Sequence, residues 1–385
     1  MAPLTINPVQ QRAERLAHHL QDAHVDVLIA GSPAAIAYAA GLNIRPFTAP
    51  GTLLLLEAGG SVRLLASEAD RTAVEHSGYQ GNADYWPVGD VSGSGRQAVL
   101  TMYLAHVGAG SRVALEGDAT QVHGPALAAI LADAEVTDAA PILDAAARIK
   151  DDDELRRLRE AANLVDIAYT AVVDRMTPEL RAYEIVRNVD RSLRSAGGGD
   201  AWSPLEHAAG ITRASHFPKN SLVTLLDRIP ETGVLHRGEP LPFALYPLSH
   251  LYTGAAGTTI VFEPPSASLK NAADALSAAT EAAIAAVAPG VRADEVYAAY
   301  KRGLGGAIAP GHLDPVIGYS VGTGVGRPLL AAGSGDVLEP GMALSIRTAA
   351  AREHGPGIAF QSTVLVTGSG HERLNIVPQR LIHLY

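Results

Sequence analysis

One arginine in this chain directly follows a run of apolar residues, and its position suggests chemistry. Arg347 comes after 342–346 (Met-Ala-Leu-Ser-Ile), a run that is predicted to form a buried strand. A buried arginine is costly unless it is paired, and its planar fork suits a carboxylate. Two interpretations follow. Arg347 anchors an anionic group or a developing negative charge, or it pairs with an internal carboxylate such as Asp227.

A second motif has the pattern of a nucleophilic serine. Residues 318–322 (Gly-Tyr-Ser-Val-Gly) match G-x-S-x-G, which exposes its serine only where a strand turns sharply into a helix. Residues 323–328 (TGVGRP) do not favour the start of a helix, so we interpret the match as fortuitous. The chain has no cysteine, which excludes disulfides, thiolate nucleophiles and thiolate metal sites.

The composition restricts the class of protein. The chain has 385 residues, of which 47% are hydrophobic, so it is long enough for two domains and unlike a disordered chain. Its net charge of −10 argues against a nucleic-acid partner, which requires a basic surface. No apolar run is long enough to cross a membrane, and residues 1–7 lack the pattern of a secretory signal. We expect a cytoplasmic protein without nucleic-acid or membrane partners.

Helix and strand signals alternate in the first part of the chain. Residues 8–22 are predicted to form a helix and residues 25–30 a buried strand. Residues 52–56 and 62–65 flank two glycines and predict a hairpin. The alternation predicts an α/β domain over residues 1–145.

The clearest boundary in the sequence comes next. Residues 151–153 are all aspartate and would face the positive end of a helix dipole, and apolar residues then recur at helical spacing from 155 to 171. Further helices are predicted from about Arg181, over 270–288 and over 294–301, with apolar strands between and after them. Residues 146–385 are therefore predicted to form an α+β domain.

Five segments, in this order and at these distances, resemble the family of methionine aminopeptidase, aminopeptidase P, prolidase and creatinase. They are 148–155 (RIKDDDEL), 251–259 (LYTGAAGTT), 318–322 (GYSVG), 338–347 (LEPGMALSIR) and 361–367 (QSTVLVT). The resemblance implies the pita-bread fold for the C-terminal domain and a creatinase-like N-terminal domain. It also implies a homodimer, and a dimetal site in the relatives that hydrolyse peptides.

The residues at the family's metal-ligand positions are unable to bind metal ions. The resemblance places Ala244 and Ala255 at the two aspartates, Tyr319 at the histidine, and Arg347 and Gln361 at the two glutamates. Alanine offers no donor atom and arginine repels a cation, whereas two divalent ions need several carboxylate and imidazole ligands. No Asp or Glu lies between residues 240 and 262, so another alignment restores no ligand there. We expect no metal site and no other cofactor.

Creatinase is the family's precedent for hydrolysing a C–N bond without metal, and the resemblance to it suggests acid–base groups. Its catalytic histidine corresponds to Asp227, whose apolar neighbours in 225–229 could raise the pKa of the carboxyl and make it a general base. A solvated aspartate beside Arg228 is the alternative. Tyr319 could donate to an oxyanion or move a proton, or it could fill the space left by the metal site.

Other residues are assigned to substrate binding. They are His207, Arg213, His216, Tyr252, Gln361 and Arg45. The two histidines lie in a segment that lines the cleft in relatives, and structural histidines are the alternative. Gln361 could orient a substrate amide or only satisfy a backbone group. Arg45 loosely matches the creatinase segment that reaches into the partner subunit, and a surface arginine is the alternative.

These observations predict a metal-independent, creatinase-like homodimer that binds a small anionic or carbonyl-bearing molecule. The first hypothesis is an enzyme acting at an amide or other C–N bond, or a derived biosynthetic cyclase or isomerase, with Asp227, Tyr319 and Arg347 as catalytic residues. The alternative is an inactive pseudo-peptidase acting as a binding protein, as in a histone-chaperone subunit of this fold. A sealed polar pocket would favour the enzyme, and a pocket filled by Tyr319 and apolar side chains would favour the pseudo-peptidase.

Overall fold

The chain divides into two compact units, Met1–Ala147 and Arg148–Tyr385. The computed structural model describes residues 7–42, 51–77, 79, 81–90, 93–180, 182–196, 237–351 and 357–384. Five predicted site residues lie outside these ranges, so their assignments stay predictions: Arg45, His207, Arg213, His216 and Asp227.

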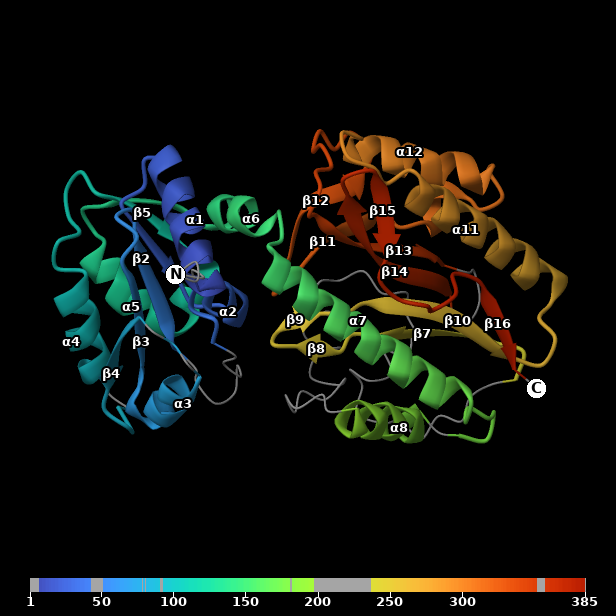
Figure 1. The fold of residues 1–385 in the computed structure, drawn as a ribbon, viewed down its shortest axis with the longest axis horizontal. Helices are drawn as coiled ribbons and strands as arrows, with labels where there is room; N and C mark the ends of the chain where they lie inside the picture. The colour runs from blue at the N-terminus through green and yellow to red at the C-terminus, as the bar shows by residue number, and fades with distance from the viewer. Residues whose placement is uncertain are drawn as a thin grey trace, which may run out of the picture. The chain divides into compact units, whose positions relative to one another are not determined.

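The first unit is a six-stranded sheet with helices on both faces (Figure 1). Its elements are α1 (Pro8–Asp22), β1 (Val27–Ala30), α2 (Pro33–Ala40), β2 (Leu53–Glu57), β3 (Val62–Ser67), α3 (Arg71–His76), β4 (Asn82–Trp86), α4 (Ser94–Tyr103), β5 (Arg112–Leu115), α5 (Gly117–Ile130), β6 (Glu135–Asp138) and α6 (Ala140–Ala147). The strand order is β4-β3-β2-β1-β5-β6. The helix predicted over residues 8–22 is α1, and the predicted hairpin is the antiparallel pair β2 and β3. Both agree with the predicted α/β class.

The second unit is an eight-stranded sheet flanked by two pairs of helices. Its elements are α7 (Asp152–Val173), α8 (Ala182–Ser195), β7 (Pro240–Leu245), β8 (Leu248–Ser249), β9 (Tyr252–Thr253), β10 (Ala256–Phe262), α11 (Ala267–Ala285), α12 (Ala293–Leu304), the 3-10 helix η2 (Pro310–His312), β11 (Val316–Val321), β12 (Val325–Ala331), β13 (Ala343–Ala350), β14 (Ile358–Thr367), β15 (Gly370–Arg373) and β16 (Leu381–Leu384). The main order is β12-β11-β13-β14-β10-β16, with β7 paired to β10 and β15 to β14. The predicted α+β class is therefore confirmed.

The two faces of this sheet have different neighbours. Figure 1 shows α11 and α12 on one side of the strands and α7 and α8 on the other. Ile346 and Ala350 of β13 belong to the apolar core beneath α11 and α12. Because successive side chains of a strand point to opposite faces, Ser345 and Arg347 face away from that core.

Local capping explains where the helices begin. Asp151 accepts a hydrogen bond from the backbone N–H of Glu154, and the Glu154 side chain accepts one from the backbone of Asp151, so a capping box fixes the start of α7. The predicted helix at 270 begins three residues earlier, at Ala267, because the Ser266 side chain caps it. No helix among the described residues has the length and apolarity needed to span a bilayer.

Gly254 allows α7 to pack closely against the strands that carry the site. A Cβ added there would lie 2.4 Å from the carbonyl oxygen of Ala161 in α7. We predict that Gly254→Ala lowers the free energy of unfolding by about 1–3 kcal/mol, the usual cost of overpacking, measured by urea denaturation. Gly335→Ala is the control, because an added Cβ there meets nothing within 4 Å. Equal loss of stability in both variants would contradict this packing argument.

Candidate functional site

The sheet brings the former metal-ligand positions together through its register. Gly257 of β10 pairs with Ala244 of β7 on one side and with Gln361 of β14 on the other. Gln361 in turn pairs with Arg347 of β13, and Tyr319 of β11 pairs with Ser345, two residues before Arg347. Ala255 joins the same region, because its backbone exchanges hydrogen bonds with the Thr363 hydroxyl. The five positions that the family resemblance selects therefore lie close together in this sheet.

Side-chain hydrogen bonds connect the middle of this cluster. The Tyr246 hydroxyl donates to Oε1 of Gln361 at 2.8 Å, and Nε2 of Gln361 donates to Oγ of Ser345 at 2.7 Å. All three residues are buried. The amide of Gln361 thus has both ends engaged inside the protein. Tyr246 and Ser345 were not among the residues predicted from the sequence to form the site.

The two tyrosines of the cluster stay protonated at neutral pH. Burial raises the pKa of the Tyr246 phenol well above its ordinary value, more than Arg347 and the bond to Gln361 lower it. Burial also raises the pKa of Tyr319, and Arg347 together with hydrogen bonds to Ser345 and Gln361 offsets this in part. Tyr319 is therefore suited to donate a hydrogen bond and unsuited to act as a base.

Arg347 forms an ion pair inside the protein. Its Nη1 lies 3.2 Å from Oδ2 of Asp314, and the Arg347 side chain is buried in β13. Internal pairing was one of the two interpretations of Arg347, with Asp227 as the example. The structure supplies Asp314, a residue that sequence analysis did not single out because it lies in a loop without a motif.

The space between these side chains is small. Ala244, Gly257, Arg347 and Gln361 and their neighbours line a cavity of about 10 Å³. That volume is enough for roughly one water molecule. Within the described ranges, no group of three or more His, Cys, Asp or Glu side chains could hold a metal ion. The donor set at the five positions does not fit the family's dimetal centre.

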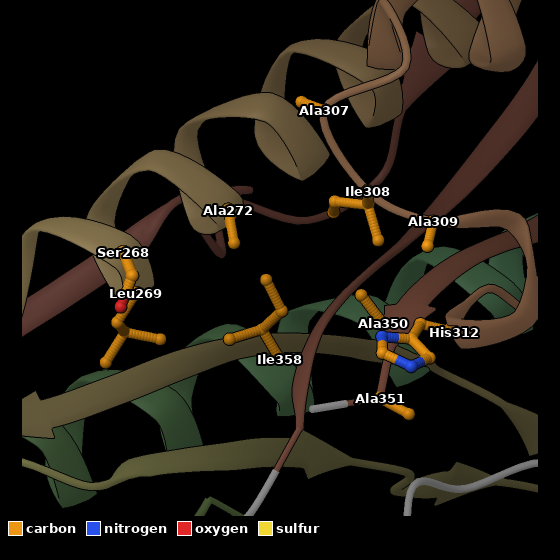
Figure 2. A pocket seen from close by; sticks show the side chains of 10 residues that line it. All are labelled: Ser268, Leu269, Ala272, Ala307, Ile308, Ala309, His312, Ala350, Ala351 and Ile358. Carbon is orange, nitrogen blue, oxygen red and sulfur yellow. The ribbon is translucent and has the colours of Figure 1, made fainter. Parts of the chain in front are cut away.

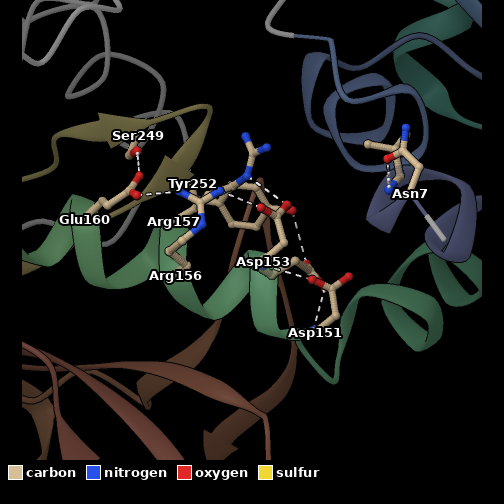
Figure 3. Close-up of polar contacts among 10 residues, drawn as sticks. Asn7, Asp151, Asp153, Arg156, Arg157, Glu160, Ser249 and Tyr252 are labelled. Carbon is tan, nitrogen blue, oxygen red and sulfur yellow. Dashed lines mark hydrogen bonds and ion pairs between the residues drawn. The ribbon is translucent and has the colours of Figure 1, made fainter. Parts of the chain in front are cut away.

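Tyr252 packs against helix α7. Its ring is buried, its hydroxyl donates to Oε1 of Glu154 at 3.3 Å, and Cζ of Arg157 lies 5.8 Å from the ring centroid. Figure 3 shows Tyr252 beside Arg157 and Asp153 at the first turns of α7. Tyr252 does not line the cavity described above.

Ser320 lies within a strand and not at a nucleophile elbow. It is buried in β11, where its Oγ accepts a hydrogen bond from Nζ of Lys150 at 3.0 Å. The element that follows β11 is the strand β12, so the strand–turn–helix geometry is absent from this part of the described chain.

A larger groove lies on the other face of the sheet. It offers about 370 Å³, and its walls come from α11, from the loop before β11 and from the facing ends of β13 and β14. Figure 2 shows Leu269, Ala272, Ile308 and Ile358 pointing into it, with the His312 imidazole at one side. None of the predicted site residues that the structure describes lines this groove. The groove is therefore lined mainly by apolar side chains, with the imidazole of His312 at its side.

Comparison with known proteins identifies both units. Residues 156–368 match the model of metallopeptidase family M24, and residues 12–148 match the creatinase/prolidase N-terminal domain. The chain is 25% identical over 261 residues to the uncharacterized peptidase YqhT of Bacillus subtilis (strain 168), which covers 66% of this chain and 70% of that protein.

Solved structures share the whole architecture at low sequence identity. The prolidase from Thermococcus sibiricus superposes with a TM-score of 0.81 at 18% identity, covering 99% of this chain and 100% of that one. The N-terminal domain of FACT complex subunit SPT16 from chickpea superposes with a TM-score of 0.73 at 14% identity, covering 96% of each chain. The predicted pita-bread architecture with a creatinase-like N-terminal domain is confirmed.

The bond from Tyr246 to Gln361 yields a prediction about stability and pH. We expect Tyr246→Phe to lower the free energy of unfolding by about 1–3 kcal/mol at pH 8, because Oε1 of Gln361 loses its donor in a buried site. The raised pKa of Tyr246 means that its contribution is present below the unfolded pKa of about 10 and is lost as pH rises through the higher folded pKa.

The measurement is urea denaturation of both proteins from pH 8 to pH 11. The difference between wild type and Tyr246→Phe should shrink toward the alkaline end. Tyr297→Phe is the control, because Tyr297 is only partly buried. A difference that is independent of pH would contradict the assignment.

Proposed function

The chain belongs to metallopeptidase family M24, and on this premise we propose that it acts without metal on a small carbonyl- or carboxylate-bearing molecule. The observation that carries the proposal is the chemistry of the five former ligand positions. Two of these positions are alanine, and the other three are Tyr319, Arg347 and Gln361. The Tyr319 and Arg347 side chains are hydrogen-bond donors, and the Gln361 amide links Tyr246 to Ser345. A metal-bound hydroxide, the nucleophile of the family's peptidases, has no ligands here.

The remaining polar groups suit the stabilisation of negative charge. Tyr319 is a neutral phenol and Arg347 is a guanidinium, and both can donate to a carboxylate, a carbonyl oxygen or an oxyanion. The substrate class that fits is an amide or a related C–N compound, and the reaction is hydrolysis, cyclisation or isomerisation. The base in this proposal is Asp227, on the sequence argument given above.

The small cavity supports a second candidate function, a pseudo-peptidase that binds a partner without catalysis. The cavity beside Arg347 and Gln361 has a volume of about 10 Å³, which is less than a substrate needs. Side chains of the described residues therefore fill this part of the site. Similarity in fold with both a prolidase and a subunit of the FACT complex does not choose between these functions, because one fold carries many.

The assembly and the compartment complete the proposal. We propose a cytoplasmic homodimer: the resemblance to creatinase favours the dimer, and the absence of cysteine is compatible with the cytoplasm. Light scattering of the purified protein tests the first statement, with a mass of one 40.0 kDa chain as the contradicting result.

The first prediction from the site concerns metal and peptidase activity. After dialysis against Mn²⁺ or Zn²⁺, the protein should hold no stoichiometric ion by elemental analysis, and it should not hydrolyse Gly-Pro or Met-Ala. A metallopeptidase of the same family, treated in parallel, is the positive control. One or two ions per chain, or dipeptide hydrolysis at a comparable rate, would refute the proposal.

A second prediction separates the enzyme from the pseudo-peptidase. N-acetyl amino acids and small cyclic amides combine a carbonyl with a carboxylate or an amide, and mass spectrometry would reveal the turnover of a member of this panel. Arg347→Ala should then lower kcat/KM by an amount equivalent to about 2–5 kcal/mol, the range for removing one member of a buried charge pair. Circular dichroism checks that the variant folds. A turnover that is indifferent to Arg347→Ala would place the reaction elsewhere.

A further inference from the structure

The two residues of the ion pair, Arg347 and Asp314, differ in their burial and in the kind of element to which they belong. Arg347 lies in the middle of β13, between β11 and β14, and only 5% of its side chain is exposed. Asp314 belongs to the short loop between η2 and β11, and 26% of its side chain is exposed. The guanidinium is therefore fixed by the sheet, whereas the carboxylate comes from a loop at the surface.

The geometry of the pair is looser than that of a tight charge-assisted hydrogen bond. Nη1 and Oδ2 are 3.2 Å apart, and charge-assisted bonds between nitrogen and oxygen are usually about 2.7–2.9 Å long. A planar guanidinium can hold a carboxylate through two parallel bonds. A ligand carboxylate could therefore match Arg347 at least as well as Asp314 does.

The surroundings of Arg347 offer donors to an incoming anion. The Tyr319 phenol lies close enough for the charge of Arg347 to act on it, and as a neutral phenol it can donate a hydrogen bond to an anion. Replacing one carboxylate by another keeps the buried guanidinium compensated throughout, which avoids the large cost of an unpaired buried charge.

We propose that Arg347 is a carboxylate-binding residue and that Asp314 is an exchangeable internal stand-in, displaced when a small carboxylate ligand binds. This inference rests on the proposed function, since it names the ligand class of the same site. Asp314 would then compete with the ligand for the guanidinium.

The test uses acetate, which is the side-chain carboxylate of aspartate as a free molecule, and acetamide as its uncharged analogue. Asp314→Asn keeps the side-chain volume and removes the charge. If the pair is closed in roughly nine molecules out of ten, removing the competition should tighten acetate binding about tenfold, since the apparent Kd scales with the fraction of open molecules. Isothermal titration calorimetry or chemical-shift titration measures both ligands on wild type and variant.

Two further variants make the result specific. Asp314→Ala should bind acetate in the place of the missing side chain, and Asp314→Ala/Arg347→Met should not. Asp336→Ala is the matched control, because Asp336 pairs with Arg327, whose side chain is 56% exposed and screened by water, so acetate should not bind there.

The contradicting outcomes are distinct. Acetate binding to Asp314→Asn that is equal to or weaker than binding to wild type would show that Asp314 is a permanent partner that positions Arg347. Equal response to acetate and acetamide would show that no carboxylate is recognised. If Asp314→Ala fails to fold, Asp314→Asn still decides the question. Tight acetate binding without any turnover would preserve this inference and favour the pseudo-peptidase, so the two proposals fail separately.

Discussion

The buried positive charge of Arg347 is the constraint on which the rest of the site depends. The family resemblance places a metal ligand at this position, where a negative side chain would face positive ions. Here the protein itself supplies the positive charge, in the middle of a strand whose residues are all buried. A buried guanidinium requires compensation, and Asp314 provides it at 3.2 Å. The other polar members of the cluster, such as Gln361 and Ser345, are neutral, so they add no second charge that would need a partner.

This arrangement explains how the family fold accommodates different side chains at all five ligand positions. The register of β7, β10, β13 and β14 decides which residues meet, and it depends on the backbone and on the apolar face beneath α11 and α12. The side chains at Arg347 and Gln361 point to the other face, so their replacement leaves the apolar core unchanged. Hydrogen bonds through Tyr246 and Ser345 then satisfy groups that metal ions would otherwise hold.

Local signals made much of this structure predictable from sequence. Asp151 and Glu154 form the capping box of α7, and the turn between β2 and β3 follows from two glycines. Tyr319, Arg347 and Gln361 were selected through the family resemblance, whose motifs lie on these strands. Asp314 and Tyr246 escaped prediction because their roles arise from contacts 33 and 115 residues away in sequence, and no local pattern marks such contacts. Tyr252 shows the same difficulty. Its ring packs against α7 because the β8–β9 hairpin lies on that helix, and no local sequence pattern marks this contact.

The charge reversal also limits what chemistry the described side chains can perform. Two phenols with raised pKa values and one guanidinium are donors at neutral pH, and donors stabilise negative charge without removing a proton. Catalysis that breaks a C–H or O–H bond therefore needs a base from another part of the chain, such as Asp227, or from the substrate itself. A ligand that brings its own carboxylate would compensate the charge of Arg347, but this ion pair would lower the basicity of that carboxylate, so another group would have to take the proton. Peptidases of this family use metal ions to activate water, whereas the polar groups described here suit the binding of an anion.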